Sequence, residues 1–156
     1  MKKYFLLLSV LVITVASCKK DSVSASQQAA KDDSAIQAYI SANNITGTTK
    51  DASGVYYKVE TPGTGAFPSS SSSVSVNYEG QVLNGSIFAP SGSNLPSTPL
   101  SSLIKGWQIG IPHVNAGGRI LLIIPSALGY GSTSPGGGIP ANAVLIFTID
   151  LLSFSN

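Results

Sequence analysis

Few side chains in this sequence commonly carry out acid–base or nucleophilic chemistry. The chain has one histidine, His113, and one cysteine, Cys18, and no cluster with the spacing of metal ligands. Serines are abundant, but there is no Gly-x-Ser-x-Gly elbow, and the stretch GTGAFP at 63–68 lacks the lysine and threonine of a phosphate-binding loop. We therefore expect no metal and no cofactor. Acid–base and nucleophilic catalysis therefore have few candidate residues in this sequence.

The charge distribution argues against a nucleic-acid partner. The chain is 156 residues long, 43% hydrophobic and 10% charged, which suits one folded domain with an appendage. Its formal net charge is +2, but from residue 52 onward three cations balance three anions: Lys58, Lys105, Arg119, Glu60, Glu79 and Asp150. A nucleic-acid binder needs a basic face, and this part of the sequence supplies none.

The N-terminus has the features of a secretory signal. Charged residues 2–3 precede the apolar run YFLLLSVLVITVAS, which is short for a transmembrane helix. The run ends in VASC at 15–18, which resembles a bacterial lipobox; the alternative is a lone thiol buried at the end of a core helix. The resemblance implies a lipidated Cys18 as the mature N-terminus and a domain anchored in the cell envelope, facing the periplasm or the exterior. Because the lysines at 19–20 carry no inner-membrane aspartate signal, we expect the outer membrane.

A tether and one helix are expected before the folded domain. Residues 19–30 are small and polar and show no hydrophobic pattern. Asp32, Asp33 and Ser34 have the chemistry of a helix N-cap. Apolar residues then recur at helical spacing up to a stop at 43–44, which predicts a short amphipathic helix. This helix either packs on the domain or spaces it from a membrane.

From residue 54 onward the pattern is mainly that of strands. Alternating apolar residues predict strands in VYYKVE and VSVNY, and Asn84-Gly85 is a strong hairpin signal. GGRILLII is apolar on both faces, which indicates a central strand, and a closing strand is expected at about 144–152. LIKGWQIGI predicts a short helix. Strands with one short helix across them indicate an α+β fold.

These segments, in this order, resemble the FKBP-type peptidyl-prolyl cis-trans isomerases. The motifs are VSVNYEGQVLNGSIFAPS, LIKGWQIGIPHVNAGGRILLIIPSALGYG and GGGIPANAVLIFTIDLL, and the likeness covers 73–154. It implies a half-open antiparallel β-sheet wrapped around a short α-helix, with a pocket between them. The expected division is a signal peptide over 1–18, a tether with a helix over 19–50 and an isomerase domain over 51–156.

The resemblance assigns the pocket residue by residue. Its implied catalytic set is Tyr78, Phe88, Ile104, Trp107, Tyr130 and Phe147. Trp107 would form the floor, the Ile104 backbone N–H and the Tyr130 hydroxyl would bind substrate carbonyls, and the loop at 132–138 would be a flap. The implied substrate-binding residues are Leu103, Ile139 and Ala89.

The sequence departs from the family at two places. The family usually has an aspartate where this chain has Ala89, and the segment before the short helix is shorter, so that Leu95 or Leu100 replaces a family phenylalanine. The implied activity is isomerisation of X–Pro bonds in proline-containing polypeptides, with macrolides as inhibitors. The Ala89 departure favours an alternative, a chaperone or binding module of weak or no activity. A β-sandwich adhesion or glycan-binding lipoprotein is disfavoured by the IKGW helix.

Overall fold

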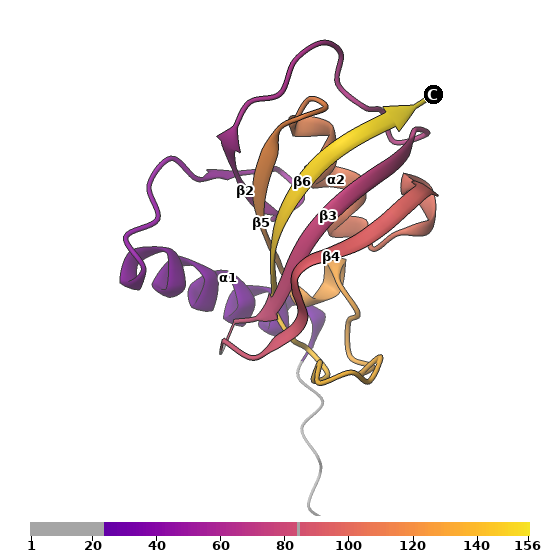
Figure 1. Cartoon of the computed structure of the whole chain (residues 1–156). Helices are drawn as coiled ribbons and strands as arrows, with labels where there is room; N and C mark the ends of the chain where they lie inside the picture. Colours follow the sequence, from indigo (N-terminus) through magenta and orange to yellow (C-terminus); the bar gives the residue numbers. More distant parts are fainter. Residues whose placement is uncertain (1–23, 84) are drawn as a thin grey trace, which may run out of the picture.

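One six-stranded antiparallel sheet organises the protein. The computed structural model describes residues 24–83 and 85–156. The strands lie in the order β1-β2-β5-β6-β3-β4, and every neighbouring pair is antiparallel. Their bounds are β1 Thr49–Lys50, β2 Tyr56–Thr61, β3 Ser73–Val82, β4 Ile87–Pro99, β5 Arg119–Ile124 and β6 Leu145–Ser155. The sheet curves around a short helix (Figure 1), which confirms the α+β, FKBP-like expectation.

The two most apolar strands lie inside the sheet. β5 lies between β2 and β6, and Ile123 pairs with Ile146 of β6. Both faces of β5 are covered, since Leu122 belongs to one buried cluster and Ile123 to another. This confirms that GGRILLII forms a central strand. β6 ends at Ser155, a few residues beyond the expected end.

The β3–β4 hairpin turns where the sequence signal lies. Asn84 lies outside the described residues, but Gly85 has φ +90°, a value that favours glycine. Its N–H donates to the Val82 carbonyl at 2.8 Å, and the Val82 N–H donates to the Ser86 carbonyl at 2.9 Å. The chain therefore reverses here and brings β4 alongside β3.

The short helix α2 (Lys105–Gly110) packs closely on one face of the sheet because two of its residues are glycine. A Cβ at Gly106 would lie 2.4 Å from the Ile124 side chain, and one at Gly110 would lie 2.5 Å from Leu122. Only a residue without a side chain permits this approach. The 3₁₀ turns η1 (Leu100–Ser102) and η2 (Ile111–His113) flank α2, and η3 (Ser126–Leu128) follows β5. The helix side of the main core includes Trp107 and Ile111.

The N-terminal helix is longer than the sequence pattern indicated. α1 runs from Ala25 to Ala42, and Ser24 is its N-cap in a capping box with Gln27. The expected start at 32–34 was wrong because Ser24-x-x-Gln27 satisfies the first-turn N–H groups earlier in the chain. Asp32 is therefore inside the helix, where its side chain is buried.

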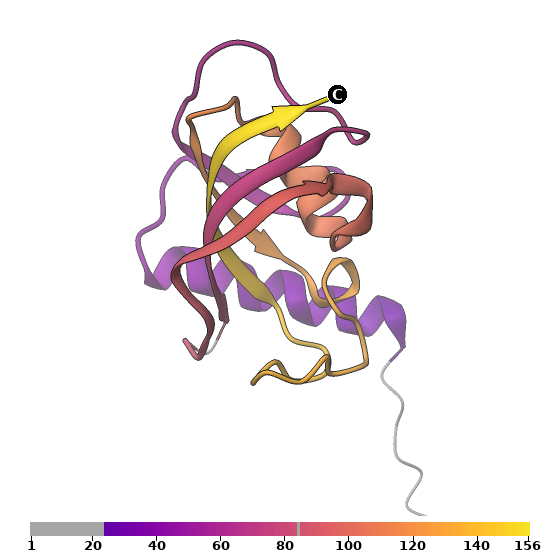
Figure 2. The same cartoon turned by 45° about the vertical axis from the view of Figure 1, so that its right-hand side comes forward.

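α1 packs on the sheet, on the face opposite α2. Ile36 is fully buried in a second cluster with Leu121 and Ile123, and Tyr39 and Ile40 pack against that cluster. Figure 2 shows α1 crossing behind the strands while α2 lies on their other side. Of the two alternatives for this helix, packing on the domain is the one observed. The central strands β5 and β6 are therefore covered on both faces.

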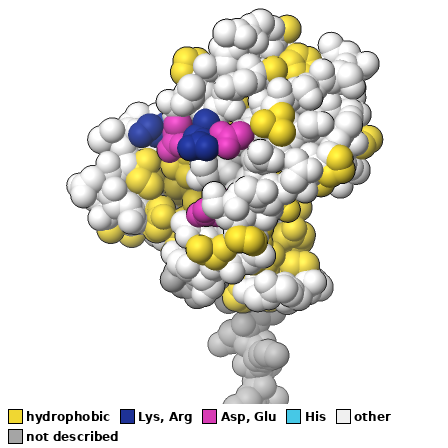
Figure 3. Space-filling view, in the orientation of Figure 1, with side chains coloured by type: hydrophobic (Ala, Val, Ile, Leu, Met, Phe, Trp, Pro, Cys, Tyr) yellow, Lys and Arg dark blue, Asp and Glu magenta, His cyan; other side chains and the backbone are white. Residues whose placement is uncertain are grey.

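Charged side chains are sparse on the face that Figure 3 shows, and most of those present lie in one small group of both signs. Within the described residues, Arg119 Nε lies 2.6 Å from Asp150 Oδ1 and forms an ion pair. None of the helices in residues 24–83 and 85–156 has the length and hydropathy to cross a membrane. The expected signal peptide and Cys18 lie outside the described residues.

Candidate functional site

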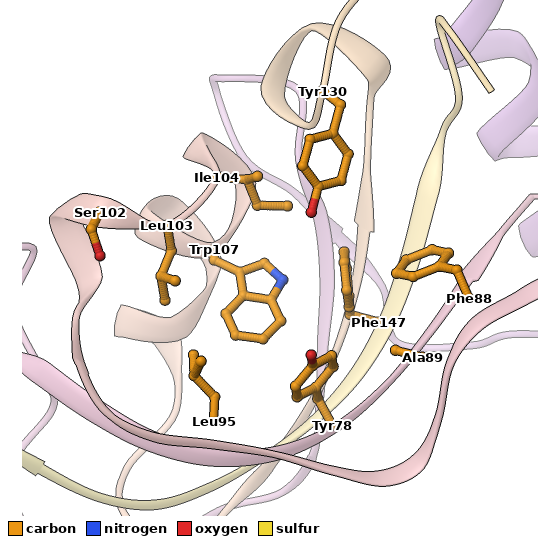
Figure 4. Close-up of a pocket in the computed structure, with 10 residues that line it drawn as sticks. All are labelled: Tyr78, Phe88, Ala89, Leu95, Ser102, Leu103, Ile104, Trp107, Tyr130 and Phe147. Atoms are coloured by element: carbon orange, nitrogen blue, oxygen red, sulfur yellow. The ribbon is translucent and has the colours of Figure 1, made fainter. Parts of the chain in front are cut away.

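A cavity of about 370 Å³ lies between α2 and the sheet. Its lining comes from β3, β4, β6, the segment from η1 to α2, and the turn after η3 (Figure 4). The lining residues are Tyr78, Phe88, Ala89, Leu95, Ser102, Leu103, Ile104, Trp107, Tyr130 and Phe147. None of these is charged at neutral pH, so the cavity is an apolar surface with a few hydroxyl groups.

Four aromatic rings hold one another in edge-to-face contact. Trp107, which is 5% exposed, meets Phe147 with ring centroids 5.1 Å apart at 87° and Tyr78 at 5.2 Å and 82°. Phe88 packs on Phe147 at 5.5 Å and 76°. Such pairs add stabilisation beyond area burial and restrict ring orientation. The rings therefore form a rigid wall and floor.

The position of Phe88 depends on a glycine in the neighbouring strand. Gly80 of β3 pairs with Ala89 of β4 and with Phe147 of β6. A Cβ at Gly80 would lie 2.5 Å from the Phe88 ring and 3.0 Å from the Phe147 ring. The glycine in the motif VNYEG thus leaves the space that the two phenylalanine rings fill.

The segment before α2 presents a backbone donor. The Ile104 carbonyl accepts the N–H groups of Trp107 and Gln108 at 3.0 and 3.2 Å, but among the described residues no partner is found for the Ile104 N–H. The Gln108 side-chain amide donates to the Leu103 carbonyl at 2.7 Å and so holds this segment in place. An unpaired N–H beside an apolar cavity is a donor for a ligand carbonyl.

Tyr130 supplies the second donor. Its ring enters from the turn after η3, and its hydroxyl points into the cavity toward Trp107 and Ile104 (Figure 4). Burial raises the pKa of Tyr130 above its ordinary value, and Tyr78 nearby adds to that effect. Because a raised pKa keeps a tyrosine protonated over a wider pH range, the hydroxyl remains a neutral hydrogen-bond donor at physiological pH.

The indole N–H of Trp107 is buried and has no hydrogen-bond partner among the described residues. Leaving such a group unpaired costs about 1–3 kcal/mol. The orientation of the indole therefore depends on packing in the core rather than on a polar anchor.

Most residues expected at the site meet at this cavity, and one does not. Eight of the nine expected pocket residues are in the lining. Ile139 is not, because its N–H bonds back to Gly136 and its side chain turns into the core, where it is 7% exposed. No residue of the loop 132–138 lines the cavity either.

The structure shows which of the two candidate leucines lines the cavity, and it adds one serine to the lining. Leu95 lines the cavity, whereas Leu100 is fully buried in the core, so Leu95 takes the place left by the missing family phenylalanine. Ser102 was not expected. It lies in a serine-rich segment, and nothing in its sequence context distinguished it from its neighbours. Ala89 is 7% exposed.

Comparisons with known proteins point to one family. Residues 65–152 match the family model of FKBP-type peptidyl-prolyl cis-trans isomerases. The peptidyl-prolyl cis-trans isomerase Mip of Coxiella burnetii is 38% identical over 120 residues, 75% of this chain and 52% of that protein. A probable FKBP-type isomerase of Haemophilus influenzae is 34% identical over 140 residues, 88% of this chain and 57% of that protein.

Solved structures agree with the sequence matches. The crystal structure of FkpA from Escherichia coli superposes with a TM-score of 0.71 at 32% identity, covering 83% of this chain and 62% of that chain. A peptidyl-prolyl cis-trans isomerase from Pseudomonas syringae gives a TM-score of 0.69 at 29% identity, covering 81% of this chain and 96% of that chain.

A half-open antiparallel sheet around a short helix, with an aromatic cavity between them, defines an FKBP-like domain. Together with the family match over more than half of its length, this shows that the chain belongs to the FKBP-type peptidyl-prolyl cis-trans isomerase family. It spans about half the length of the curated relatives it matches.

Proposed function

We propose that this protein catalyses cis-trans isomerisation of X–Pro bonds in proline-containing polypeptides. The observation that carries the proposal is the uncharged aromatic cavity with two unpaired donors, the Ile104 N–H and the Tyr130 hydroxyl, at its edge. The family membership of the chain supports it. No acid, base or nucleophile is needed, because no bond is made or broken.

The chemistry follows from amide resonance. Resonance gives the C–N bond partial double-bond character and a rotation barrier of about 18–20 kcal/mol, so uncatalysed X–Pro isomerisation takes about tens to hundreds of seconds. The twisted transition state has lost this resonance and its charge separation. A dry, apolar surround therefore favours it over the planar amide. An acceleration of about a thousandfold requires only about 4 kcal/mol of differential binding.

The cavity residues have distinct roles in this mechanism. Trp107, Phe88 and Phe147 provide a rigid slot for the proline ring. The Ile104 N–H and the Tyr130 hydroxyl bind the carbonyls that flank the rotating bond, so that rotation occurs within a fixed frame. Leu103 and Leu95 extend the apolar lining at the side of the indole (Figure 4).

A protease-coupled proline-peptide assay with the full chain in mild detergent tests the activity. We expect faster cis-to-trans relaxation, with preference for a bulky apolar residue before proline. Phe88→Ala removes an apolar wall and is expected to lower kcat/KM about tenfold or more, since burying a phenylalanine contributes about 1.5–3 kcal/mol. Ile87→Ala is the matched control, because Ile87 is the preceding residue of β4 and is 59% exposed.

A second candidate function is a binding module that holds proline-containing chains with weak or no catalysis. Ala89 favours it, because the family's usual carboxyl group is absent from the cavity lining. Relaxation at the spontaneous rate even at high protein concentration, together with saturable binding of the same peptide, would establish this function and reject the enzyme.

We also propose that the protein acts in the cell envelope as a lipoprotein anchored through Cys18, in the outer membrane rather than the inner one. The lipobox-like VASC sequence at 15–18 supports this. Each buried methylene of an acyl chain contributes about 0.8 kcal/mol of membrane affinity, and stable anchoring takes more than one chain. Mass spectrometry of the mature N-terminus is the test. An acylated Cys18 supports the proposal, and an unmodified cysteine or another N-terminus refutes it.

A further inference from the structure

The buried carboxyl group of Asp32 links α1 to the loop that carries Tyr130. Asp32 is 3% exposed. Its Oδ2 accepts hydrogen bonds from the Ser126 backbone N–H at 2.8 Å and from the Ser126 hydroxyl at 2.6 Å. Its Oδ1 accepts one from the Gln28 side-chain amide at 2.6 Å. Burying a carboxyl group is costly unless it is hydrogen-bonded, so three donors around one side chain indicate a specific contact.

Ser126 in turn organises the turn on which Tyr130 lies. Its carbonyl accepts the N–H groups of Gly129 at 3.0 Å and Gly131 at 2.8 Å, the two residues on either side of Tyr130. Gly131 has φ +63°, and glycines sample many backbone conformations unless they are held. A hydrogen-bonded path therefore runs from Asp32 through Ser126 to both neighbours of Tyr130.

We propose that Asp32 is a positioning residue for Tyr130. Through this contact, helix α1 helps to set the geometry of the cavity on the opposite face of the sheet. The inference rests on the proposed function of the cavity. Tyr130 is 40% exposed, and no hydrogen bond holds its hydroxyl within the described residues. The direction of that hydroxyl therefore depends on the backbone of its turn, and Asp32 is the side chain that anchors the start of this turn.

Two substitutions at Asp32 separate hydrogen-bond geometry from charge. Asp32→Ala removes all three contacts. Asp32→Asn retains them: its carbonyl oxygen replaces Oδ2 against Ser126, and its amide donates to Gln28 once that side-chain amide rotates to present its oxygen. A misplacement of about 1 Å at a catalytic group can cost about 100-fold. We expect kcat/KM to fall about tenfold in Asp32→Ala and to stay within about twofold of wild type in Asp32→Asn.

Asp33→Ala is the matched control for helix docking. Asp33 is the next residue, but its carboxyl group pairs with Lys50 and accepts a hydrogen bond from the Tyr56 hydroxyl at 2.9 Å. Neither Lys50 nor Tyr56 forms a hydrogen bond or ion pair with residues 126–131. We expect this variant to lose stability and keep its kcat/KM. An equal loss of kcat/KM in Asp33→Ala would mean that any loosening of α1 impairs the cavity, and would overturn a specific role for Asp32.

A double-mutant cycle with Tyr130→Phe tests whether the effect passes through the tyrosine hydroxyl. If it does, Asp32→Ala lowers kcat/KM by less than about twofold in the Tyr130→Phe background, because interacting residues give non-additive effects. Full additivity would overturn the proposal, as would a wild-type kcat/KM for Asp32→Ala. Ser126→Ala, which removes only the hydroxyl bond, supplies a milder variant for the same cycle if Asp32→Ala does not fold.

Amide hydrogen exchange of the full chain gives a readout independent of catalysis. We expect faster exchange at the Gly129 and Gly131 N–H groups in Asp32→Ala, with strand β5 unchanged, and wild-type protection in Asp32→Asn. Unchanged exchange at both glycines would overturn the proposal. If the wild-type protein accelerates no X–Pro relaxation, the proposed function fails, and the exchange result by itself still decides whether Asp32 positions this turn.

Discussion

Replacing Gly106 by alanine tests whether close approach of α2 to the sheet sets the shape of the cavity. An ideal Cβ at this position would lie 2.4, 2.5 and 2.7 Å from three atoms of the Ile124 side chain. Carbon atoms in contact are normally about 3.5–4.0 Å apart, so the helix must move outward by about 1 Å. Ile124 is fully buried and its β-branched side chain is stiff at χ1, so it cannot readily rotate away.

The expected change in the free energy of unfolding follows from two opposed effects. Overpacking of this kind costs about 1–3 kcal/mol, whereas alanine in a helix is favoured over glycine by about 1 kcal/mol. We expect Gly106→Ala to lower the free energy of unfolding by up to about 2 kcal/mol. The effect on the cavity is larger, because Trp107 is the next residue and a shift of about 1 Å can cost about 100-fold in rate.

Urea titrations, the emission of Trp107 and kcat/KM for a proline peptide measure these effects. Because the chain has one tryptophan, its emission reports on the floor of the cavity alone, and we expect a shift in Gly106→Ala. Ile124→Ala removes all three atoms that the new Cβ would meet. By itself it costs about 2–5 kcal/mol through the space it leaves, but it relieves the clash in the double variant.

We therefore expect the double variant Gly106→Ala/Ile124→Ala to be more stable than the sum of the single changes, by about 1–3 kcal/mol, and to regain the wild-type Trp107 emission. Additive free energies, or a Gly106→Ala protein with wild-type emission and kcat/KM, would refute the argument that the glycine holds α2 against the sheet.

Four further predictions concern charge and ligands. Ala89→Asp adds a carboxyl group to the cavity. We expect about a fivefold gain in kcat/KM, equivalent to one hydrogen bond of about 1 kcal/mol. An unchanged rate in the folded variant would show that this cavity is organised differently. The Arg119 guanidinium holds the pKa of Asp150 below its usual value, so the stabilisation is present above the unfolded-state pKa and lost as pH falls through the folded-state pKa. In urea titrations, Asp150→Asn therefore lowers stability at neutral pH by less than about 1 kcal/mol, because the pair is exposed, and the difference disappears as the pH falls below the folded-state pKa of Asp150. Since burial raises the pKa of Tyr130 and no acid, base or histidine lines the cavity, kcat/KM is expected to be flat from about pH 6 to about pH 9; a titration within that range would contradict the assigned donor. A macrolide of the kind that binds this family is expected to quench Trp107, and unchanged emission during calorimetrically observed binding would reject the indole as the floor.

The sequence was informative wherever the structural signal is local or periodic. Alternating apolar residues predicted strands β2 and β3, the two-faced apolar run GGRILLII predicted the central position of β5, and LIKGWQIGI predicted α2. Strand β1 and the length of β4 were not predicted. The family motifs named the five aromatic residues that lie together in the cavity lining, because side chains at alternate strand positions and after a fixed hairpin have little freedom in where they point. Their roles in binding stay predictions.

The sequence pattern predicted a wrong start for helix α1 because a second possible N-cap lies upstream of the expected one. Asp32 has the chemistry of an N-cap, but Ser24 and Gln27 form a complete capping box upstream, and a satisfied first turn leaves no role for a second cap. Ile139 follows three glycines with positive φ, a conformation that leaves the direction of the next side chain undetermined by sequence, and its binding role stays a prediction.

What the sequence determined was therefore the α+β class, the order of the main strands and α2, and which aromatic residues gather at the cavity. The tertiary structure decided which leucine lines the cavity, on which face α1 packs, and where the buried carboxyl group of Asp32 finds its partners. The physical reason is distance along the chain, since Asp32 and Ser126 are 94 positions apart. Local periodicity and capping preferences describe only residues that are close in sequence. They therefore cannot encode a contact between two side chains that meet only when α1 packs on the sheet.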